Sequence, residues 1–180
     1  SGMKILAVDI GTGTQDILLF DSEKAVENAV QMVMPAPTVI AARRVRNATT
    51  SLLPLILTGT NMGGGPVTGA VLEHLAAGLP VYGTAAAVVT FDDDPAMIRD
   101  MGIEIISEDE AIRLRGSHVV LQDLDLDMVR RAVSEFQVIP DWDILAVAVF
   151  DHGNAPPKYS DRKFRFDYLR QHLLDGGSDV

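Results

Sequence analysis

The residues best suited to chemistry lie near the N-terminus, in the sequence Asp-Ile-Gly-Thr-Gly-Thr-Gln-Asp (residues 9–16), between two apolar segments of strand length. Its two glycines allow a tight turn that brings backbone N–H groups close to an anion, and its two threonines add hydroxyl donors. An aspartate at the end of a strand can hold a hydrated divalent cation. The pattern indicates a phosphate-binding loop without the lysine of the Walker motif. The alternative is an ordinary hairpin turn that binds nothing. The candidate residues are Asp9, Gly11, Thr12, Gly13 and Thr14.

A second glycine-rich loop occupies residues 59–65, between a strand-like run and a helical pattern that begins at Pro66. Such a loop brings unpaired amide donors and the positive end of a helix dipole to one point, which suits an anion. The candidate binding residues are Gly63, Gly64 and Gly65. The alternative is a close-packed turn without a ligand.

A third candidate follows the most apolar run of the chain, residues 144–150, where the sequence continues Asp-His-Gly-Asn. Open α/β sheets place ligands at the carboxyl ends of their central strands. We therefore expect Asp151 and Gly153 to belong to a site. His152 is either a general base or ligand, or a solvated side chain with no role.

The N-terminal string VDIGTGTQDILLFD resembles the first phosphate motif of the actin, heat-shock chaperone and sugar-kinase ATPase superfamily. Ribonuclease-H-like domains of that superfamily begin with a strand, a D-x-G-[TS] turn and a second strand. The resemblance implies ATP and Mg²⁺ as ligands, with residues 11–14 along the phosphates. It also implies that Asp9 and Asp151 are the catalytic, metal-binding carboxylates. Residues 63–65 resemble the adenosine motif of the same superfamily, although the motifs follow each other in a different order.

Across the whole chain, DIGTGTQD, TGTNMGGGP and FDHGN…FRF resemble an uncharacterised prokaryotic family, common in archaea, whose members are often labelled pyruvate formate-lyase activating enzymes. Members of that family are longer, so we expect this chain to be the N-terminal domain of a larger protein. A radical enzyme of the labelled kind holds an iron–sulfur cluster with three cysteines. The sequence has no cysteine. We therefore expect no iron–sulfur cluster and reject that activity for this polypeptide.

Composition narrows the classes of partner. Fifteen Lys and Arg residues stand against 25 Asp and Glu residues, and the net charge of −10 repels nucleic acid and anionic membranes. We find no apolar run long enough to span a bilayer and no signal-peptide pattern, so we expect a cytoplasmic protein. Residues 1–2 resemble the remnant of an expression tag, and the natural chain is expected to begin at Met3.

The elements that position these residues can be predicted from periodicity. Apolar runs alternate with helical patterns, which predicts one α/β domain over residues 3–180. The resemblance to the ATPase superfamily implies, more narrowly, a ribonuclease-H-like mixed sheet that is flanked by helices and opens with a β-hairpin. We predict strands at residues 4–9, 16–21, 29–34, 55–58, 79–84, 103–106, 118–122 and 143–150. We predict helices at residues 37–51, 66–77, 95–101, 107–114, 125–136 and 166–174, and leave the type of the apolar segment 85–91 open.

Three of these predictions rest on particular features. Residues 144–150 are the most apolar run and should form a central strand. Ser107 and Glu110 have the spacing of a capping box. Pro66 and Gly78 suit the first position of a helix and the position just after its end.

Two functions from different classes follow. The first is a nucleotide-binding ATPase or kinase domain whose cleft is completed by a second domain of the same protein. The second is a non-catalytic domain that keeps the fold and senses a ligand or binds another protein.

Overall fold

The computed structural model describes residues 2–149, 156 and 159–174. The chain divides into two compact units, Ser1–Phe150 and Asp151–Val180. The first unit holds the two sheets of the described residues, and the second holds α7 (Asp161–Leu174). The α/β class predicted from periodicity is confirmed.

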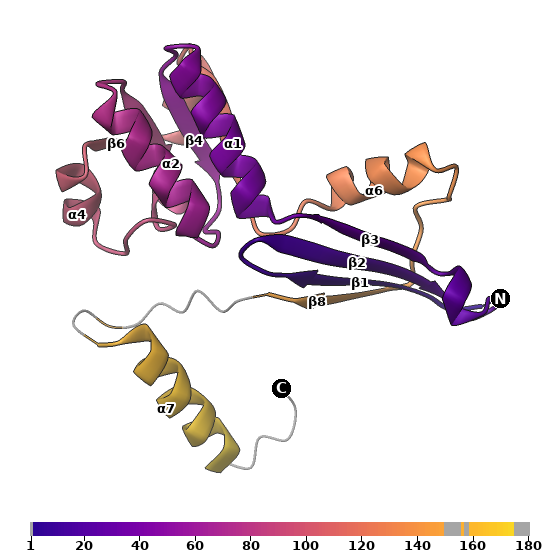
Figure 1. Ribbon diagram of the computed structural model, residues 1–180. Coiled ribbons are helices and arrows are strands. Elements are labelled where there is room, and N and C mark those ends of the chain that lie inside the picture. Colours follow the sequence, from indigo (N-terminus) through magenta and orange to yellow (C-terminus); the bar gives the residue numbers. More distant parts are fainter. Residues whose placement is uncertain (1, 150–155, 157–158, 175–180) are drawn as a thin grey trace. The chain divides into compact units, whose positions relative to one another are not determined.

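Sheet A is the four-stranded sheet that begins at the N-terminus (Figure 1). Its strands are β1 (Lys4–Ile10), β2 (Thr14–Asp21), β3 (Val30–Pro35) and β8 (Ile144–Ala148). They lie in the order β3-β2-β1-β8. The pairs β1–β2 and β2–β3 are antiparallel, whereas β8 is parallel to β1. The predicted opening β-hairpin is therefore confirmed. A short 3₁₀ helix, η1 (Val26–Asn28), connects β2 to β3.

Sheet B is built by the segment between β3 and β8, residues 37–121, with four parallel strands in the order β6-β5-β4-β7. The strands are β4 (Leu55–Gly59), β5 (Val81–Thr84), β6 (Ile103–Ile106) and β7 (Ser117–Leu121). The helices of this segment are α1 (Pro37–Thr50), α2 (Gly65–Ala76), α3 (Ala85–Val88), α4 (Pro95–Asp100) and α5 (Glu108–Arg113). The strands thus form two sheets and not the single sheet that we predicted.

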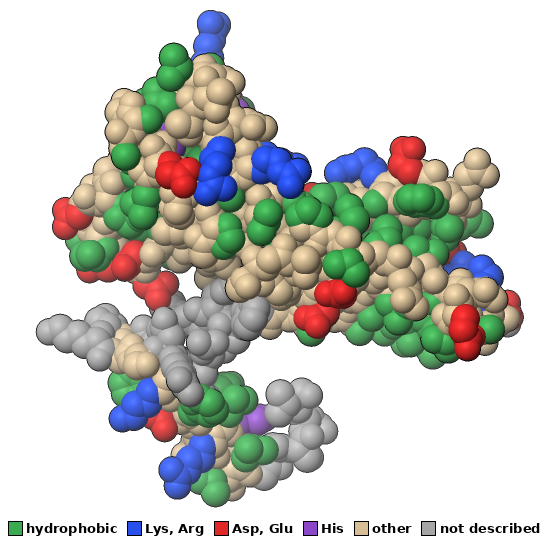
Figure 2. All heavy atoms as spheres, viewed as in Figure 1, with side chains coloured by type: hydrophobic (Ala, Val, Ile, Leu, Met, Phe, Trp, Pro, Cys, Tyr) green, Lys and Arg blue, Asp and Glu red, His purple; other side chains and the backbone are tan. Residues whose placement is uncertain are grey.

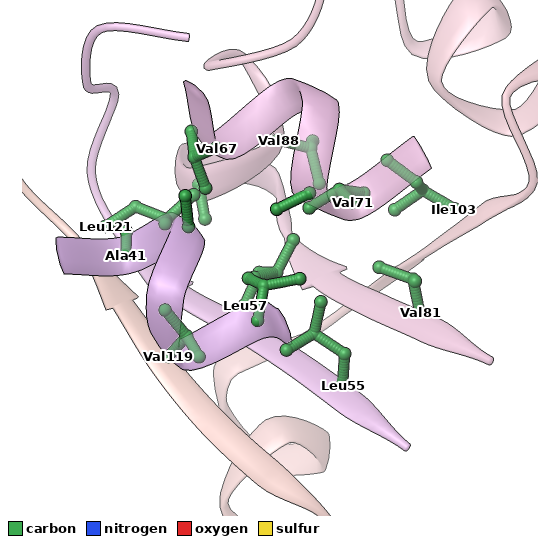
Figure 3. Close-up of a cluster of buried hydrophobic side chains, with 14 of the residues drawn as sticks. Ala41, Leu55, Leu57, Val67, Val71, Val81, Val88, Ile103, Val119 and Leu121 are labelled. Carbon is green, nitrogen blue, oxygen red and sulfur yellow. The ribbon is translucent and has the colours of Figure 1, made fainter. Parts of the chain in front are cut away.

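The larger hydrophobic core joins sheet B to helices α1 and α2 (Figure 3). Leu55 and Leu57 are two residues apart on β4, so their side chains lie on the same face of the strand, and both are fully buried in this core. Val67 and Val71 come from α2, four residues apart and therefore on one side of that helix. Ala41 on α1 is also buried in this cluster, where its small side chain allows α1 to lie close.

Sheet A is covered on one face by α6 (Leu126–Glu135). Alternate residues of β1 and β2 are buried with two valines of this helix. These residues are Leu6, Val8, Ile10, Ile17, Leu19, Val129 and Val133. The intervening residues belong to the opposite face, where the side chains of Asp9 and Asp16 are exposed. Hydrophobic side chains are also exposed over the part of the surface that sheet A forms in Figure 2.

Our prediction of a central strand at residues 144–150 was wrong. The strand is β8, which lies at the edge of sheet A, and all five of its residues are exposed. Ile144, Leu145 and Val147 have 39–45% of their surface accessible. An apolar run normally marks a strand that is covered on both faces. Within the described residues, no second strand pairs with the outer edge of β8 and no helix covers it.

The predicted residue patterns at the ends of two helices are confirmed. Ser107 Oγ accepts a hydrogen bond from the Glu110 N–H at 3.2 Å, and the Glu110 carboxylate accepts one from the Ser107 N–H at 2.8 Å, which confirms the capping box. Gly78 takes a positive φ of 74° directly after the last turn of α2. The open segment 85–91 contains the short helix α3, and α7 begins at Asp161, five residues before the predicted start. No helix in the described part of the chain has both the length and the apolar character to cross a bilayer.

His74 is a buried titratable group in the core of sheet B, in the last turn of α2. Its Nδ1 lies 2.8 Å from Thr49 Oγ1, and that hydroxyl donates its only proton to the Val45 carbonyl at 3.0 Å. Among the described residues, Nε2 has no hydrogen-bond partner. Burial lowers the pKa of His74, and the nearby Pro80 carbonyl opposes this effect only in part.

We expect the stability of the protein to fall as the pH drops below about 6.5, because an unfolded His74 then takes up a proton that the folded ring resists. The contribution of the neutral ring is complete above the unfolded pKa and is lost as the pH falls through the lowered, folded one. Urea unfolding followed by circular dichroism at pH 7.5, 6.5 and 5.5 measures this slope. His74→Leu should flatten it, whereas His118→Gln, at an exposed histidine, should not. An unchanged slope in His74→Leu would contradict the assignment.

Candidate functional site

The hairpin loop, residues 9–14, lies at the edge of sheet A where two parallel strands end. Strand β1 ends at Ile10, and β8 runs in the same direction and places Ala148 beside Asp9. Strand β2 begins at Thr14 and leads away from the same edge. The carboxyl ends of adjacent parallel strands are where open α/β sheets bind their ligands. The predicted phosphate loop is thus at a favourable place in the sheet.

Backbone hydrogen bonds hold both ends of the hairpin loop, whereas the N–H groups at its centre have no acceptor among the described residues. The Gly11 N–H donates to the Thr14 carbonyl at 2.9 Å, and the Gly13 carbonyl accepts from the Ala36 N–H at 3.0 Å. Within the described residues, the N–H groups of Thr12 and Gly13 have no partner. Residues 12–14 are exposed. The loop therefore presents two backbone donors and two threonine side chains to the solvent.

The glycines of the hairpin loop are not explained by the turn itself. Gly11 and Gly13 both have φ outside the positive region, so the backbone there is open to other residues. A Cβ atom at Gly13 would meet no heavy atom within 4 Å, and one at Gly11 would lie 3.1 Å from the Thr14 carbonyl oxygen. We expected glycine here for a tight turn, but at position 13 neither conformation nor packing requires it. Because Gly13 has no side chain, a ligand can reach the backbone N–H groups of the loop from the solvent.

Two carboxylates flank the hairpin loop on the uncovered face of sheet A. Asp9 on β1 is paired in register with Asp16 on β2, and both are exposed. They line one hollow of about 590 Å³, which β3 and β8 also help to form. Among the described residues, neither carboxylate makes an ion pair. Sequence reasoning assigned no role to Asp16, although its position across a hairpin from Asp9 could have suggested one.

The second glycine-rich loop follows β4 in sheet B, at the point where the strand order reverses between β4 and β7. Backbone conformation or packing favours glycine at three of its positions, 59, 64 and 65. Gly59 has a φ of 98°, and a Cβ atom there would lie 2.3 Å from the Leu121 carbonyl oxygen. A Cβ atom at Gly64 would lie 3.0 Å from the Thr90 carbonyl oxygen. The Gly63 N–H donates to Asp123 Oδ1 at 3.0 Å. Gly65 has a φ of 28° with open space around it.

The start of α1 joins the two glycine-rich loops. Ala36, the residue before the helix, donates its N–H to the Gly13 carbonyl at 3.0 Å. Two residues later, Thr38 Oγ1 donates to the Gly64 carbonyl at 3.1 Å and accepts from the Val67 N–H at 3.4 Å. Both loops are therefore fixed to one turn of helix. The structure brings the first two predicted sites together in this way, although they belong to different sheets.

The third predicted site, with Asp151, His152 and Gly153, lies outside the described residues. In the sequence, Asp151 follows the last residue of β8 by three positions, and β8 ends beside Asp9. Over residues 2–149, 156 and 159–174, no group of three or more His, Asp or Glu side chains is placed to hold a metal ion. Asp9 and Asp16 form a pair and not such a group.

No curated protein matches the chain. The model of a family described as "Putative pyruvate format-lyase activating enzyme (DUF1786)" matches residues 62–179, about two thirds of the chain. The match starts inside the second glycine-rich loop and extends beyond β8 and α7, but does not include the hairpin loop. From its match over this span, the chain belongs to the DUF1786 family.

Proposed function

We propose that this chain is a nucleotide-binding domain that holds the phosphates of ATP, together with Mg²⁺, at the hairpin loop. The observation that carries the proposal is the state of residues 12 and 13, whose amides are exposed and have no partner in the described structure. A second observation supports it: residue 13 is glycine at a position where neither backbone conformation nor packing needs glycine. A side chain is costly at that position only if something must approach the backbone.

The strand order of sheet A supports the resemblance to ribonuclease-H-like ATPases. Three antiparallel strands that follow each other in the chain are extended, on the β1 side, by a strand parallel to β1. In this arrangement the D-x-G-T turn connects β1 and β2, as the resemblance implies. Sheet B is then an insertion between β3 and the fourth strand of that domain. We propose this finer fold type on the strand order together with the N-terminal motif.

The residues of the hairpin loop suit a magnesium–phosphate ligand. Mg²⁺ in proteins is commonly held by one or two carboxylates together with substrate phosphates, and Asp9 offers such a carboxylate beside the free amides. Bound Mg²⁺ would neutralise phosphate charge. The amides of residues 12 and 13 would hold phosphate oxygens, and Asp151 is proposed as the second catalytic carboxylate. The loop of residues 63–65, joined to the hairpin loop through α1, is proposed to lie along the adenosine.

The family description names a different activity, that of a radical activating enzyme. The cluster of such an enzyme is held by cysteine thiolates, and the 180 residues contain none. We therefore do not extend that activity to this chain.

Calorimetric titration with MgATP and MgADP tests the proposal. We expect binding in the micromolar to millimolar range by the unaltered protein, because only half of a cleft is proposed to lie in this chain. Asp9→Asn, which removes the charge and keeps the shape, should weaken binding about tenfold or more. Glu104→Gln alters an exposed strand carboxylate in sheet B and should leave binding unchanged. Equal affinities of Asp9→Asn and the unaltered protein would contradict the site.

A non-catalytic interaction domain is the second candidate function, and one observation favours it. Strand β8 is apolar and exposed over all five residues at the edge of sheet A. Apolar edge strands readily pair with another chain unless something covers them. Absence of nucleotide binding in the same titration, up to millimolar MgATP, would favour this function over the first.

A further inference from the structure

Gln15 is a fully buried polar residue that follows the hairpin loop directly. Its side chain lies on the same face of β2 as Ile17 and Leu19, the face that α6 covers. Its Nε2 donates a hydrogen bond to the Pro35 carbonyl at 3.0 Å, whereas its Oε1 has no partner among the described residues. A buried acceptor without a partner costs free energy, which an apolar side chain would avoid. The bond to Pro35 is therefore what glutamine supplies here and an apolar residue could not.

The hydrogen bond from Gln15 orients the peptide unit that holds the hairpin loop. The Pro35 carbonyl and the Ala36 N–H belong to one planar, trans peptide unit. Gln15 binds the carbonyl of this unit, and the N–H of the same unit donates to the Gly13 carbonyl at 3.0 Å. Pro35 and Pro37 stand on both sides of Ala36 and restrict the backbone, so the unit is a stiff anchor. If the unit turned away from Gln15, its N–H would also turn away from the loop.

Two anchored peptide units enclose the two free amides of the loop. The unit after Gly13 is held through its carbonyl by Ala36. The unit before Gly11 is held through the Gly11 N–H, which donates to the Thr14 carbonyl at 2.9 Å. The N–H groups of Thr12 and Gly13 belong to the two units in between. Because glycine permits many backbone conformations, these two units keep one orientation only while both flanking units are held.

We infer that Gln15 is a positioning residue, which holds the peptide unit of residues 35–36 and thereby keeps the N–H groups of residues 12 and 13 oriented toward a phosphate. The inference rests on the proposed function. Donors that are oriented before the ligand arrives lose less conformational entropy on binding, and this raises the affinity. Gln15 is itself buried, so it acts through residues 35–36 and not by contact with the ligand.

Gln15→Met tests the inference, because methionine is also long and unbranched and cannot donate a hydrogen bond. Hydrogen exchange followed by nuclear magnetic resonance measures the protection of the Ala36 N–H, and calorimetry measures the affinity for MgATP. We expect the protection of this N–H to fall about tenfold or more, and the MgATP affinity to fall by a similar factor. Leu19→Met is the matched control, since it introduces the same side chain on the same buried face of β2 and removes no hydrogen bond. It should change neither value by more than about twofold.

The outcomes separate the role of Gln15 from the nucleotide function. If the unaltered protein binds MgATP and Gln15→Met binds it equally well, the positioning role is overturned and the nucleotide function stands. Unchanged protection of the Ala36 N–H in Gln15→Met also overturns the role. If the unaltered protein does not bind MgATP, both are overturned. If Gln15→Met does not fold, the unaltered protein decides: saturating MgATP should shift the resonances of the Ala36 N–H and the Gln15 side-chain amide, and unshifted resonances overturn the role.

Discussion

Gly13→Val is expected to abolish MgATP binding while leaving the fold intact. The valine side chain would stand over the exposed amides of the hairpin loop, where a phosphate must approach to within hydrogen-bond distance. At least a hundredfold loss of affinity follows, because two charge-assisted hydrogen bonds to phosphate would be blocked at once. Calorimetry measures the loss, and Gly13→Ala should show an intermediate one.

The same substitution should cost little stability, and this separates binding from folding. Gly13 has φ outside the positive region, and a Cβ atom there meets nothing within 4 Å. We therefore expect the free energy of unfolding to change by less than about 0.5 kcal/mol. Fluorescence of Trp142, the only tryptophan, reports on sheet A because that side chain packs against the core between sheet A and α6. Unchanged MgATP affinity in a folded Gly13→Val protein would remove the hairpin loop from the site.

Local features of the sequence predicted local structure well. The capping box of Ser107 and Glu110 and the hairpin around residues 9–16 each depend on residues that are close in the chain, and both are present. Strand and helix ranges were close for the same reason. What periodicity could not predict was which strands share a sheet, because pairing joins residues that are far apart in sequence. Strand β8, for example, pairs with a strand about 140 residues earlier.

In the candidate site, too, the features formed by neighbouring residues were predictable and those formed by residues far apart in the sequence were not. The motif at residues 9–14 was found because glycine, threonine and aspartate stand together in the sequence. Its link to the second glycine-rich loop runs through Ala36 and Thr38, which no local pattern marks. The position of Asp16 opposite Asp9 depends on cross-strand register, which follows only from the exact length of the turn. The apolar run at residues 144–150 misled us about β8, because composition cannot tell a covered strand from an exposed edge.

Gly59→Ala is expected to destabilise the protein strongly, by about 3 kcal/mol or more. The residue has a φ of 98°, which L-residues rarely adopt. A Cβ atom would lie 2.3 Å from the Leu121 carbonyl oxygen and 3.0 Å from the Leu121 nitrogen, both of them backbone atoms of the adjacent β7. Relief of the clash must separate β4 from β7 and break the hydrogen bond of 2.8 Å from the Thr60 N–H to that carbonyl. Backbone strain of about 1–2 kcal/mol and overpacking of about 1–3 kcal/mol together give this magnitude.

Gly69→Ala is expected to have the opposite effect on stability. Gly69 lies within α2, has φ outside the positive region, and offers open space to a Cβ atom. Alanine there should stabilise the protein by about 0.5–1 kcal/mol, because it restricts the unfolded chain and favours the helix. Urea unfolding of both variants, followed by circular dichroism, measures the difference. If Gly59→Ala lowers the free energy of unfolding by less than about 1 kcal/mol, the backbones of β4 and β7 must lie farther apart than the contact of 2.3 Å implies. The close approach of Gly59 to the Leu121 backbone would then no longer explain why glycine stands at position 59.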